Sequence, residues 1–349
     1  MGEATRTYAG ATRTGRALVL ALLLAATGAA AALTALKLGY PAVSWRELFG
    51  VLVYRNGSEL AVASVLELRM PRVVLGALSG AMLGISGVLM QTGLRNPLAS
   101  PDLIGVSAGS SLAIAVITVF HLPVAFSLYP LFGLLGALIG GAIVLASVYG
   151  RSESASIILM GTAVSAMLNG MIVWLITMGT QNDINLLYRY LMGSLSGRHW
   201  DHVEYTLPWA AIGIPAAMMF AKPLNLLRLG DEQAEALGLN VARLRLLLLA
   251  TSGVMVSAVV AQCGPIGYIA LLGPYLARAL LRTEDARWVL PGSAAVGAVL
   301  LVTADLLAKT VFTPREVPVG LWTTMVGVPI LILMLVWRRR ARDDRSLQS

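Results

Sequence analysis

The chain has 349 residues, of which 57% are hydrophobic and only 13% are charged, and its mean hydropathy is +0.76. Soluble domains carry roughly 25% charged residues, so this composition excludes a soluble protein and indicates an integral membrane protein. The net charge of +8 does not indicate a nucleic-acid-binding protein, because the basic residues lie in short breaks between apolar runs and near the C-terminus.

The expected elements are membrane-spanning α-helices, because about 20 mostly apolar residues cross the hydrocarbon core of a bilayer. This length rule predicts about ten spans. In chain order they occupy residues 17–38, 71–94, 101–120, 124–149, 156–178, 205–221, 244–263, 266–281, 288–308 and 318–337. The first follows Arg13 and Arg16 as in a signal peptide, but its apolar run exceeds the usual length of about 7–15 residues. We therefore expect it to be retained.

The distribution of basic residues predicts the orientation of the spans. An even number of spans places both termini on one side. If that side is the cytoplasm, the cytoplasmic segments hold about two thirds of the 26 lysines and arginines, as membrane proteins prefer. We expect a cytoplasmic N-terminal tail at 1–16, a membrane domain at 17–337 and a basic cytoplasmic tail at 338–349. Residues 222–243 would also face the cytoplasm.

Glycines recur at spacings that favour close contact between helices. Small residues let helix backbones approach each other in lipid, where packing rather than the hydrophobic effect drives association. The glycines concerned are Gly76, Gly80, Gly84 and Gly87 in the second span and Gly133, Gly136 and Gly140 in the fourth. We interpret them as packing positions.

Several kinds of chemistry have no support in the sequence. The single cysteine, Cys263, excludes an internal disulfide. The three histidines, His121, His199 and His202, fall in or near outer segments, and we expect neither a metal site nor a catalytic site. A phosphate-binding G-x-x-x-x-G-K-[ST] sequence does not occur, so this chain is not expected to hydrolyse ATP.

The span centres carry no clear charge, and Asp305 and Lys309 lie near the outer end of the ninth span. Ion-coupled carriers commonly place ionisable residues within the membrane. Their scarcity here argues against such a carrier without excluding it, and it favours an energy source on another subunit.

Five stretches carry a resemblance to a known family. The longest is RMPRVVLGALSGAMLGISGVLMQTGLRNPLASPDLIGVSAGSSLAI at 69–114. The others are GDEQAEALGLN from 230, GPIGYIALLGPYLAR from 264, ADLLAK from 304 and EVPVGLWTTMVGVPILILML from 316. On these stretches the chain resembles the FecCD family, the permease subunits of bacterial ABC importers for ferric siderophores, haem and cobalamin, and the resemblance extends over about residues 60–340. The resemblance implies an all-α, multi-pass type II importer permease in the bacterial plasma membrane.

One motif departs from the family pattern. Near the start of the eighth span the family usually has a Pro-His pair followed by Arg, whereas this chain has Pro274, Tyr275 and Arg278. Tyrosine is larger than histidine and uncharged. Any role that rests on the histidine is therefore in doubt here.

The charged segment at about 230–240 stands out in an apolar chain. Its pattern alone fits a solvated surface helix with acidic residues in the first turn. The resemblance instead implies the coupling helix, which sits in a cleft of the cytoplasmic ATPase and moves with it. The residues implied are Gly230, Asp231, Glu232, Gln233, Ala234, Leu237 and Gly238. Ala234 and Leu237 would give this helix a small apolar face.

Basic residues at the outer end of a span require an explanation, because lysine and arginine are normally more frequent on the cytoplasmic side of a membrane protein. Arg69 and Arg72 could extend to lipid phosphates. The resemblance implies instead that they, together with Lys309, receive glutamates of an extracytoplasmic binding protein. Lys309 stands where the family more usually has arginine. Lysine offers a positive charge, but it lacks the planar guanidinium that binds both oxygens of a carboxylate.

The resemblance also implies gate and pathway residues. Asn96 and Leu98, in the loop RNPLASPD, and Ser154 would lie near a cytoplasmic gate, although an ordinary turn explains the loop equally well. Met90 and Gln91 are expected in the translocation pathway, whose walls should bind cargo weakly.

The resulting hypothesis is a permease that works by alternating access. Its expected partners are two cytoplasmic ABC ATPases, a second permease subunit, identical or related, an extracytoplasmic binding protein and membrane lipid. ATP and Mg²⁺ would bind to the ATPases, and this chain would bind no cofactor. Ferric siderophore is the expected cargo, with haem and cobalamin as alternatives. An ion-coupled secondary carrier is the alternative from a different class.

Overall fold

The computed structural model describes residues 2–147, 154–313 and 315–346, and within these ranges all regular structure is helical. The longer helices are α1 (Gly2–Lys37), α4 (Met70–Gly93), α5 (Val106–Val119), α6 (Tyr129–Ser147), α7 (Ser154–Met178), α9 (Trp200–Met219), α12 (Val241–Cys263), α13 (Ile269–Leu281), α14 (Ala286–Thr310) and α15 (Val319–Ser346). The shorter elements are α2 (Trp45–Tyr54), α3 (Glu59–Val62), the π-helix η1 (Ala63–Arg69), the 3₁₀-helices η2 (Pro101–Ile104) and η3 (Phe126–Leu128), α8 (Gln181–Leu191), α10 (Ala221–Leu227) and α11 (Asp231–Ala236).

The apolar helices match the predicted spans. Within the described ranges, 6 helices are long and apolar enough to cross a membrane, and the pair α9 and α10, bent by 47°, raises this to 7. The shorter apolar helices α5, α13 and residues Val319–Leu333 of α15 occupy the three remaining predicted positions. The predicted all-α, multi-pass class is therefore confirmed.

Two predicted spans differ from the observed helices near their N-terminal ends. The second was expected to begin at 71, but α3, η1 and α4 form a continuous helix of 35 residues from Glu59. Pro71 does not end it, because it directly follows the π-helix η1, where the pattern of backbone hydrogen bonds already changes from i→i−5 to i→i−4. The third expected span, 101–120, is divided at Gly105, whose φ of +71° separates η2 from α5.

The expected tails at 1–16 and 338–349 are helical where the structure describes them. Helix α1 begins at Gly2, and α15 continues to Ser346. Helix α1 contains no proline, and α15 contains none after Pro329. Once a helix is nucleated, each further residue extends it at little cost, so both helices continue into the tails.

The glycine spacings correspond to close helix crossings, as predicted. A Cβ atom on Gly80 would lie 2.3 Å from the carbonyl oxygen of Gly297, and one on Gly84 would lie 2.1 Å from that of Ser293. These contacts join α4 to α14. Helices α5 and α6 meet in the same way, with a Cβ on Gly109 2.3 Å from the carbonyl oxygen of Gly136.

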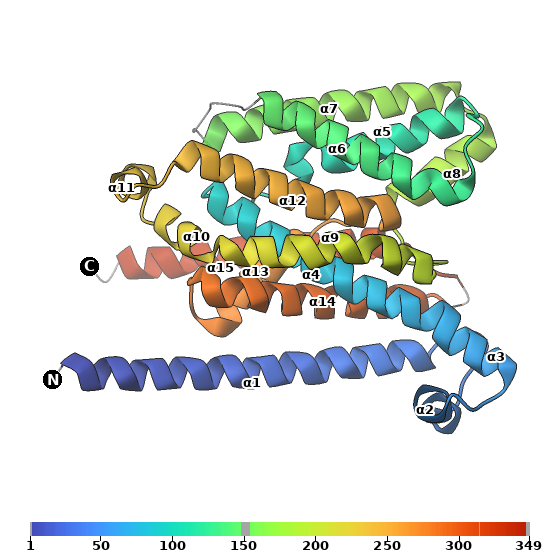
Figure 1. Cartoon of the computed structure of the whole chain (residues 1–349), viewed down its shortest axis with the longest axis horizontal. Coiled ribbons are helices and arrows are strands. Elements are labelled where there is room, and N and C mark those ends of the chain that lie inside the picture. The colour runs from blue at the N-terminus through green and yellow to red at the C-terminus, as the bar shows by residue number, and fades with distance from the viewer. Residues whose placement is uncertain (1, 148–153, 314, 347–349) are drawn as a thin grey trace.

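The helices form a bundle in which α4 and α12 are inside and α1 is at the margin (Figure 1). The most apolar stretches of α4 and α12 are 72% buried within the chain, whereas that of α1 is only 11% buried. Helix α11 lies at the same end of the bundle as the start of α1 and the end of α15, and α2, α3 and α8 lie at the opposite end (Figure 1). We call the first the α11 end and the second the α2 end.

Candidate functional site

Two glycines delimit α11. Gly230 has a φ of +125° and Gly238 a φ of +84°, which glycine adopts far more easily than residues with a Cβ atom. The helix between them has only 6 residues, from Asp231 to Ala236. It is seen nearly end-on while the spans lie across the page, so it runs across the bundle (Figure 1).

The faces of α11 differ from the sequence expectation. Ala234 is 0% exposed and belongs to the main hydrophobic core, and Leu239 packs against the same core. Leu237 is 61% exposed on the other side. The two residues therefore do not form one apolar face: Ala234 fixes the helix to the bundle, and Leu237 projects from it. The other exposed residues are Glu232, Gln233, Glu235, Ala236 and Gly238.

Asp231 connects α11 to the spans. Both of its carboxylate oxygens accept hydrogen bonds from Nη2 of Arg245 in α12, at 2.9 and 3.0 Å. No role was predicted for Arg245 from the sequence. Its position, one residue after Leu244 and directly before the apolar run that begins at Leu246, was the signal of a buried charge.

The predicted gate residues fall on different elements. Asn96 and Leu98 lie in the loop after α4, where the Asn96 Oδ1 atom accepts a hydrogen bond from the Leu98 N–H at 2.9 Å. Leu98 is 45% exposed. Ser154 is the first residue of α7, and its side chain lies outside the described residues. Gating by these residues stays a prediction.

The two predicted pathway residues are buried within the chain, Met90 at 1% and Gln91 at 4% exposure. The Gln91 amide donates to the carbonyl oxygen of Leu271 at 3.3 Å and accepts from Nη1 of Arg278 at 2.6 Å. Neither side chain reaches solvent in this conformation, so their place in a pathway stays a prediction. Arg278, from the motif that carries Tyr275, thus ties α13 to α4.

At the α2 end, Arg72 forms a forked ion pair with Asp305 through bonds of 2.8 and 3.0 Å. Its remaining nitrogen lies 3.0 Å from an oxygen of Glu316. Ser196 donates to the same carboxylate at 2.7 Å. Partial burial acts to raise the pKa of Glu316, but the Arg72 charge and the Ser196 hydrogen bond outweigh it and hold that pKa below its ordinary value.

The other two predicted docking cations also bond within the chain. Arg69 is 7% exposed. It donates to the carbonyl oxygens of Leu36, Lys37 and Pro41, where the C-terminal end of α1 favours a positive charge. Lys309 donates to the carbonyl oxygen of Ala35. The structure therefore places all three cations at one end of the bundle. Their docking role stays a prediction.

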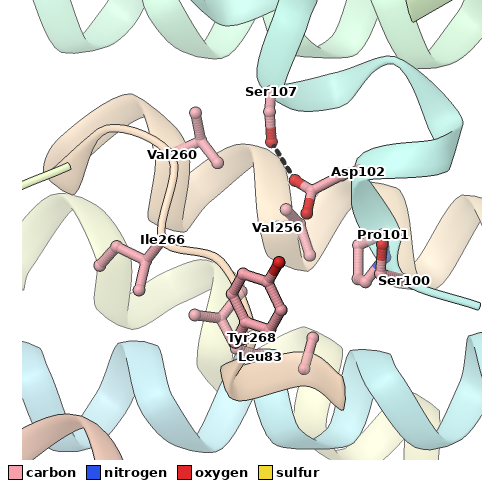
Figure 2. Close-up of a pocket in the computed structure, with 10 residues that line it drawn as sticks. Leu83, Ser100, Pro101, Asp102, Ser107, Val256, Val260, Ile266 and Tyr268 are labelled. Atoms are coloured by element: carbon pink, nitrogen blue, oxygen red, sulfur yellow. Dashed lines mark hydrogen bonds between the residues drawn. The ribbon is translucent and has the colours of Figure 1, made fainter. Parts of the chain in front are cut away.

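A small cleft of about 290 Å³, including its open side, separates η2 from α12 and α13 (Figure 2). Its walls are mostly apolar, but Ser107 donates a 2.7 Å hydrogen bond to Asp102 there, and Tyr268 lines the same cleft (Figure 2). Sequence reasoning did not identify this cleft, because its walls come from four separate parts of the chain.

Comparison with known proteins gives a consistent result. The model of the FecCD transport family matches residues 19–337. The chain is 37% identical to the Fe(3+) dicitrate transport system permease protein FecD of Escherichia coli, over 93% of this chain and 99% of that protein. It is 37% identical to the hemin transport system permease protein HmuU of Yersinia pestis, over 80% of this chain and 84% of that protein.

A solved structure agrees over nearly the whole length. It is described as an inward-facing conformation of a putative metal-chelate type ABC transporter, with a TM-score of 0.79 and 26% identity. The match covers 92% of this chain and 98% of that one. The resemblance seen in the five sequence stretches is thereby confirmed, and this chain belongs to the FecCD transport family.

Proposed function

We propose that this chain is the membrane permease of an ATP-driven importer and that α11 is the element through which the ATPase acts on it. The observation that carries the proposal is the shape of α11. A short helix is fixed to the core by Ala234 and Asp231 and presents exposed Leu237 beyond the spans. A small apolar contact surrounded by charges is the kind of surface that fits a groove in a partner protein.

The proposal includes the following partners. Two cytoplasmic ATPases bind ATP and Mg²⁺, and this chain binds no cofactor. A second permease subunit completes the translocation pathway, and an extracytoplasmic binding protein delivers cargo at the α2 end, where Arg69, Arg72 and Lys309 lie. Each ligand shifts the permease between outward- and inward-facing forms by binding one form more tightly than the other.

The proposed orientation follows from the same assignment. The chain lies in the bacterial plasma membrane with the α11 end in the cytoplasm, so both termini are cytoplasmic. The basic residues support this orientation, because several lie next to α11 or in the last turns of α15. They are Arg228, which follows α10, Arg243 and Arg245, in the first two turns of α12, and the arginines after Trp337.

Ferric siderophore is the cargo that we propose, with haem and cobalamin as alternatives. The relatives are named for ferric dicitrate and for hemin, which are both iron-containing chelates. We attribute the choice between cargoes to the binding protein, because no residue of this sequence separates one cargo from another.

Uptake in reconstituted vesicles tests the proposal. The vesicles contain this chain, its ATPase and its binding protein, with ATP on the ATPase side and a radioactive iron siderophore as cargo. Leu237→Asp places a charge in the proposed contact while the native side chain is 61% exposed, so the fold should tolerate it. Leu122→Asp makes the same change at a residue that is 44% exposed in an outer loop.

We expect ATP-dependent uptake that Leu237→Asp abolishes and Leu122→Asp preserves. If the iron siderophore is not taken up but haem or cobalamin stimulates ATP hydrolysis, the proposed cargo is wrong and the importer hypothesis is retained. Uptake that needs an ion gradient and no ATPase would show an ion-coupled carrier. If no ATPase binds and no cargo stimulates hydrolysis, the importer hypothesis itself is wrong.

A further inference from the structure

Arg245 is a charged residue in a place where charge is costly. It lies in the second turn of α12, is 1% exposed, and is the bulkiest of the described side chains that are fully buried. A buried guanidinium is stable only when carboxylate or carbonyl oxygens replace the water that it loses. The identity of those oxygens therefore shows which parts of the chain Arg245 holds together.

Two of its nitrogens bind two different elements. Nε donates to the carbonyl oxygen of Gly93, the last residue of α4, at 2.9 Å. Nη2 donates to both carboxylate oxygens of Asp231, the first residue of α11, at 2.9 and 3.0 Å. The guanidinium is planar and rigid, so it fixes the position of Asp231 relative to Gly93 more closely than a flexible ammonium would.

The loop that carries the predicted gate residues begins at this connection. Arg95 lies two residues after Gly93, and its Nη1 atom is 3.7 Å from the same Asp231 carboxylate. Asn96 and Leu98 follow directly. A shift of α11 therefore acts on the end of α4 and on the start of this loop through charged contacts, not only through apolar packing.

We propose that Arg245 is a positioning residue that transmits the displacement of α11 to the end of α4 and to residues 94–100. This inference rests on the proposed function, because it takes α11 as the element that the ATPase moves. Arg245 itself is 1% exposed, so it is placed to pass the movement on inside the chain and not to receive it from a partner. Its role is to make α11 and the end of α4 move as one unit.

Two conservative variants test the connection in the complete transporter. Asp231→Asn removes the charge and keeps the size of a side chain that is 37% exposed, so the fold should tolerate it. Arg245→Lys keeps a charge for Asp231 but offers no planar group that also reaches Gly93. Asp201→Asn is the matched control, because it makes the same change at an exposed residue at the α2 end.

The first measurement is cargo uptake per ATP hydrolysed, determined in the same vesicles. We expect uptake per ATP hydrolysed to fall about tenfold in both variants, which lies within usual coupling energies between sites. Because the measured quantity is a ratio, it does not depend on whether either variant changes the rate of hydrolysis itself. Asp201→Asn should match the unmodified protein. An unchanged ratio in Asp231→Asn would overturn the proposal, even if Arg245→Lys fails to fold.

The second measurement separates transmission from a merely structural role. With Cys263→Ala as background, spin labels at positions 235 and 98 are each measured against a label at position 122 in the outer loop, with and without ATP. We expect ATP to move both labels in the unmodified protein and only the label at 235 in Asp231→Asn. Movement of both labels in the variant would overturn the proposal. If neither label moves in the unmodified protein and Leu237→Cys gives no cross-link to the ATPase, the proposed function has failed instead.

Discussion

At the scale of single residues, buried charges of this membrane protein form ion pairs at both ends of the bundle. Arg72 pairs with Asp305, and their side chains are 12% and 6% exposed. Arg245, 1% exposed, pairs with Asp231 at the opposite end of the bundle. The sequence correctly placed Arg72 and Asp305 near one end, but it did not indicate that they are partners. Ion pairing of this kind depends on side-chain positions that only the packed helices define.

The Arg72–Asp305 pair leads to a prediction about stability. Arg72→Met leaves the Asp305 carboxylate buried without its main partner, and losing one member of a buried pair costs about 3–5 kcal/mol. We expect the single variant to unfold at a clearly lower temperature in detergent. The double variant Arg72→Met with Asp305→Leu should recover most of the loss, because no unpaired buried charge is then left at Asp305. A double variant that is less stable than the single one would contradict this explanation.

Glu316 leads to a prediction about pH. Its pKa in the folded protein lies below the ordinary value of 4.5, so its contacts with Arg72 and Ser196 stabilise the fold above that pH. The contribution is lost as the pH falls through the folded pKa, because the protonated carboxyl no longer attracts Arg72. We expect the unfolding temperatures of the unmodified protein and Glu316→Gln to differ at neutral pH and to converge below pH 4.5. A gap that widens on acidification would reverse the assigned sign.

At the scale of the helices, apolar length predicted the spans well and missed the helices that do not span. Helices α2 and α8 are short, and a rule based on about 20 apolar residues does not detect them. Their signal was present in another form. Ser44 with Glu47, and Thr180 with Asp183, form capping boxes at their beginnings. A hydroxyl residue followed three residues later by a carboxyl residue indicates the start of a helix, whether the rest of that helix is polar or apolar.

The effect of replacing a glycine by alanine should depend on whether that glycine lies at a close helix crossing. Gly84→Ala would bring a Cβ atom to 2.1 Å from the carbonyl oxygen of Ser293 and force α4 and α14 apart. Such overpacking costs about 1–3 kcal/mol, so we expect a lower unfolding temperature. Gly170→Ala in α7 is the control, because no atom lies within 4 Å of its added Cβ. A Gly84→Ala variant as stable as Gly170→Ala would show that the helices separate at little cost.

At the scale of the whole molecule, the fold places the two ends of the described chain on one side of the bundle. The start of α1, the end of α15 and α11 lie at one end of the bundle (Figure 1). That arrangement agrees with the even number of spans expected from the sequence. Which end faces the cytoplasm is a separate question, and the excess of basic residues is the argument for the α11 end.

Cysteine labelling tests this orientation. In the Cys263→Ala background, Leu237→Cys lies on α11, where the native side chain is 61% exposed, and Tyr40→Cys lies at the α2 end, where it is 99% exposed. A membrane-impermeant maleimide should label position 40 in right-side-out vesicles and position 237 in inside-out vesicles. Labelling in the opposite order would invert the topology and place α11 out of reach of a cytoplasmic ATPase.

The sequence by itself determined the membrane location, the approximate positions of the spans, the glycines that pack closely and the family. Each of these depends on composition, on the length of an apolar run or on a motif within one stretch of chain. The tertiary structure decided the partners of the charges. Arg72 and Asp305 are 233 residues apart, and Arg245 and Gly93 are 152 apart. It also turned Ala234 toward the core and Leu237 away from it. These outcomes depend on which helices cross and on where along their lengths they meet. Local sequence periodicity does not contain that information.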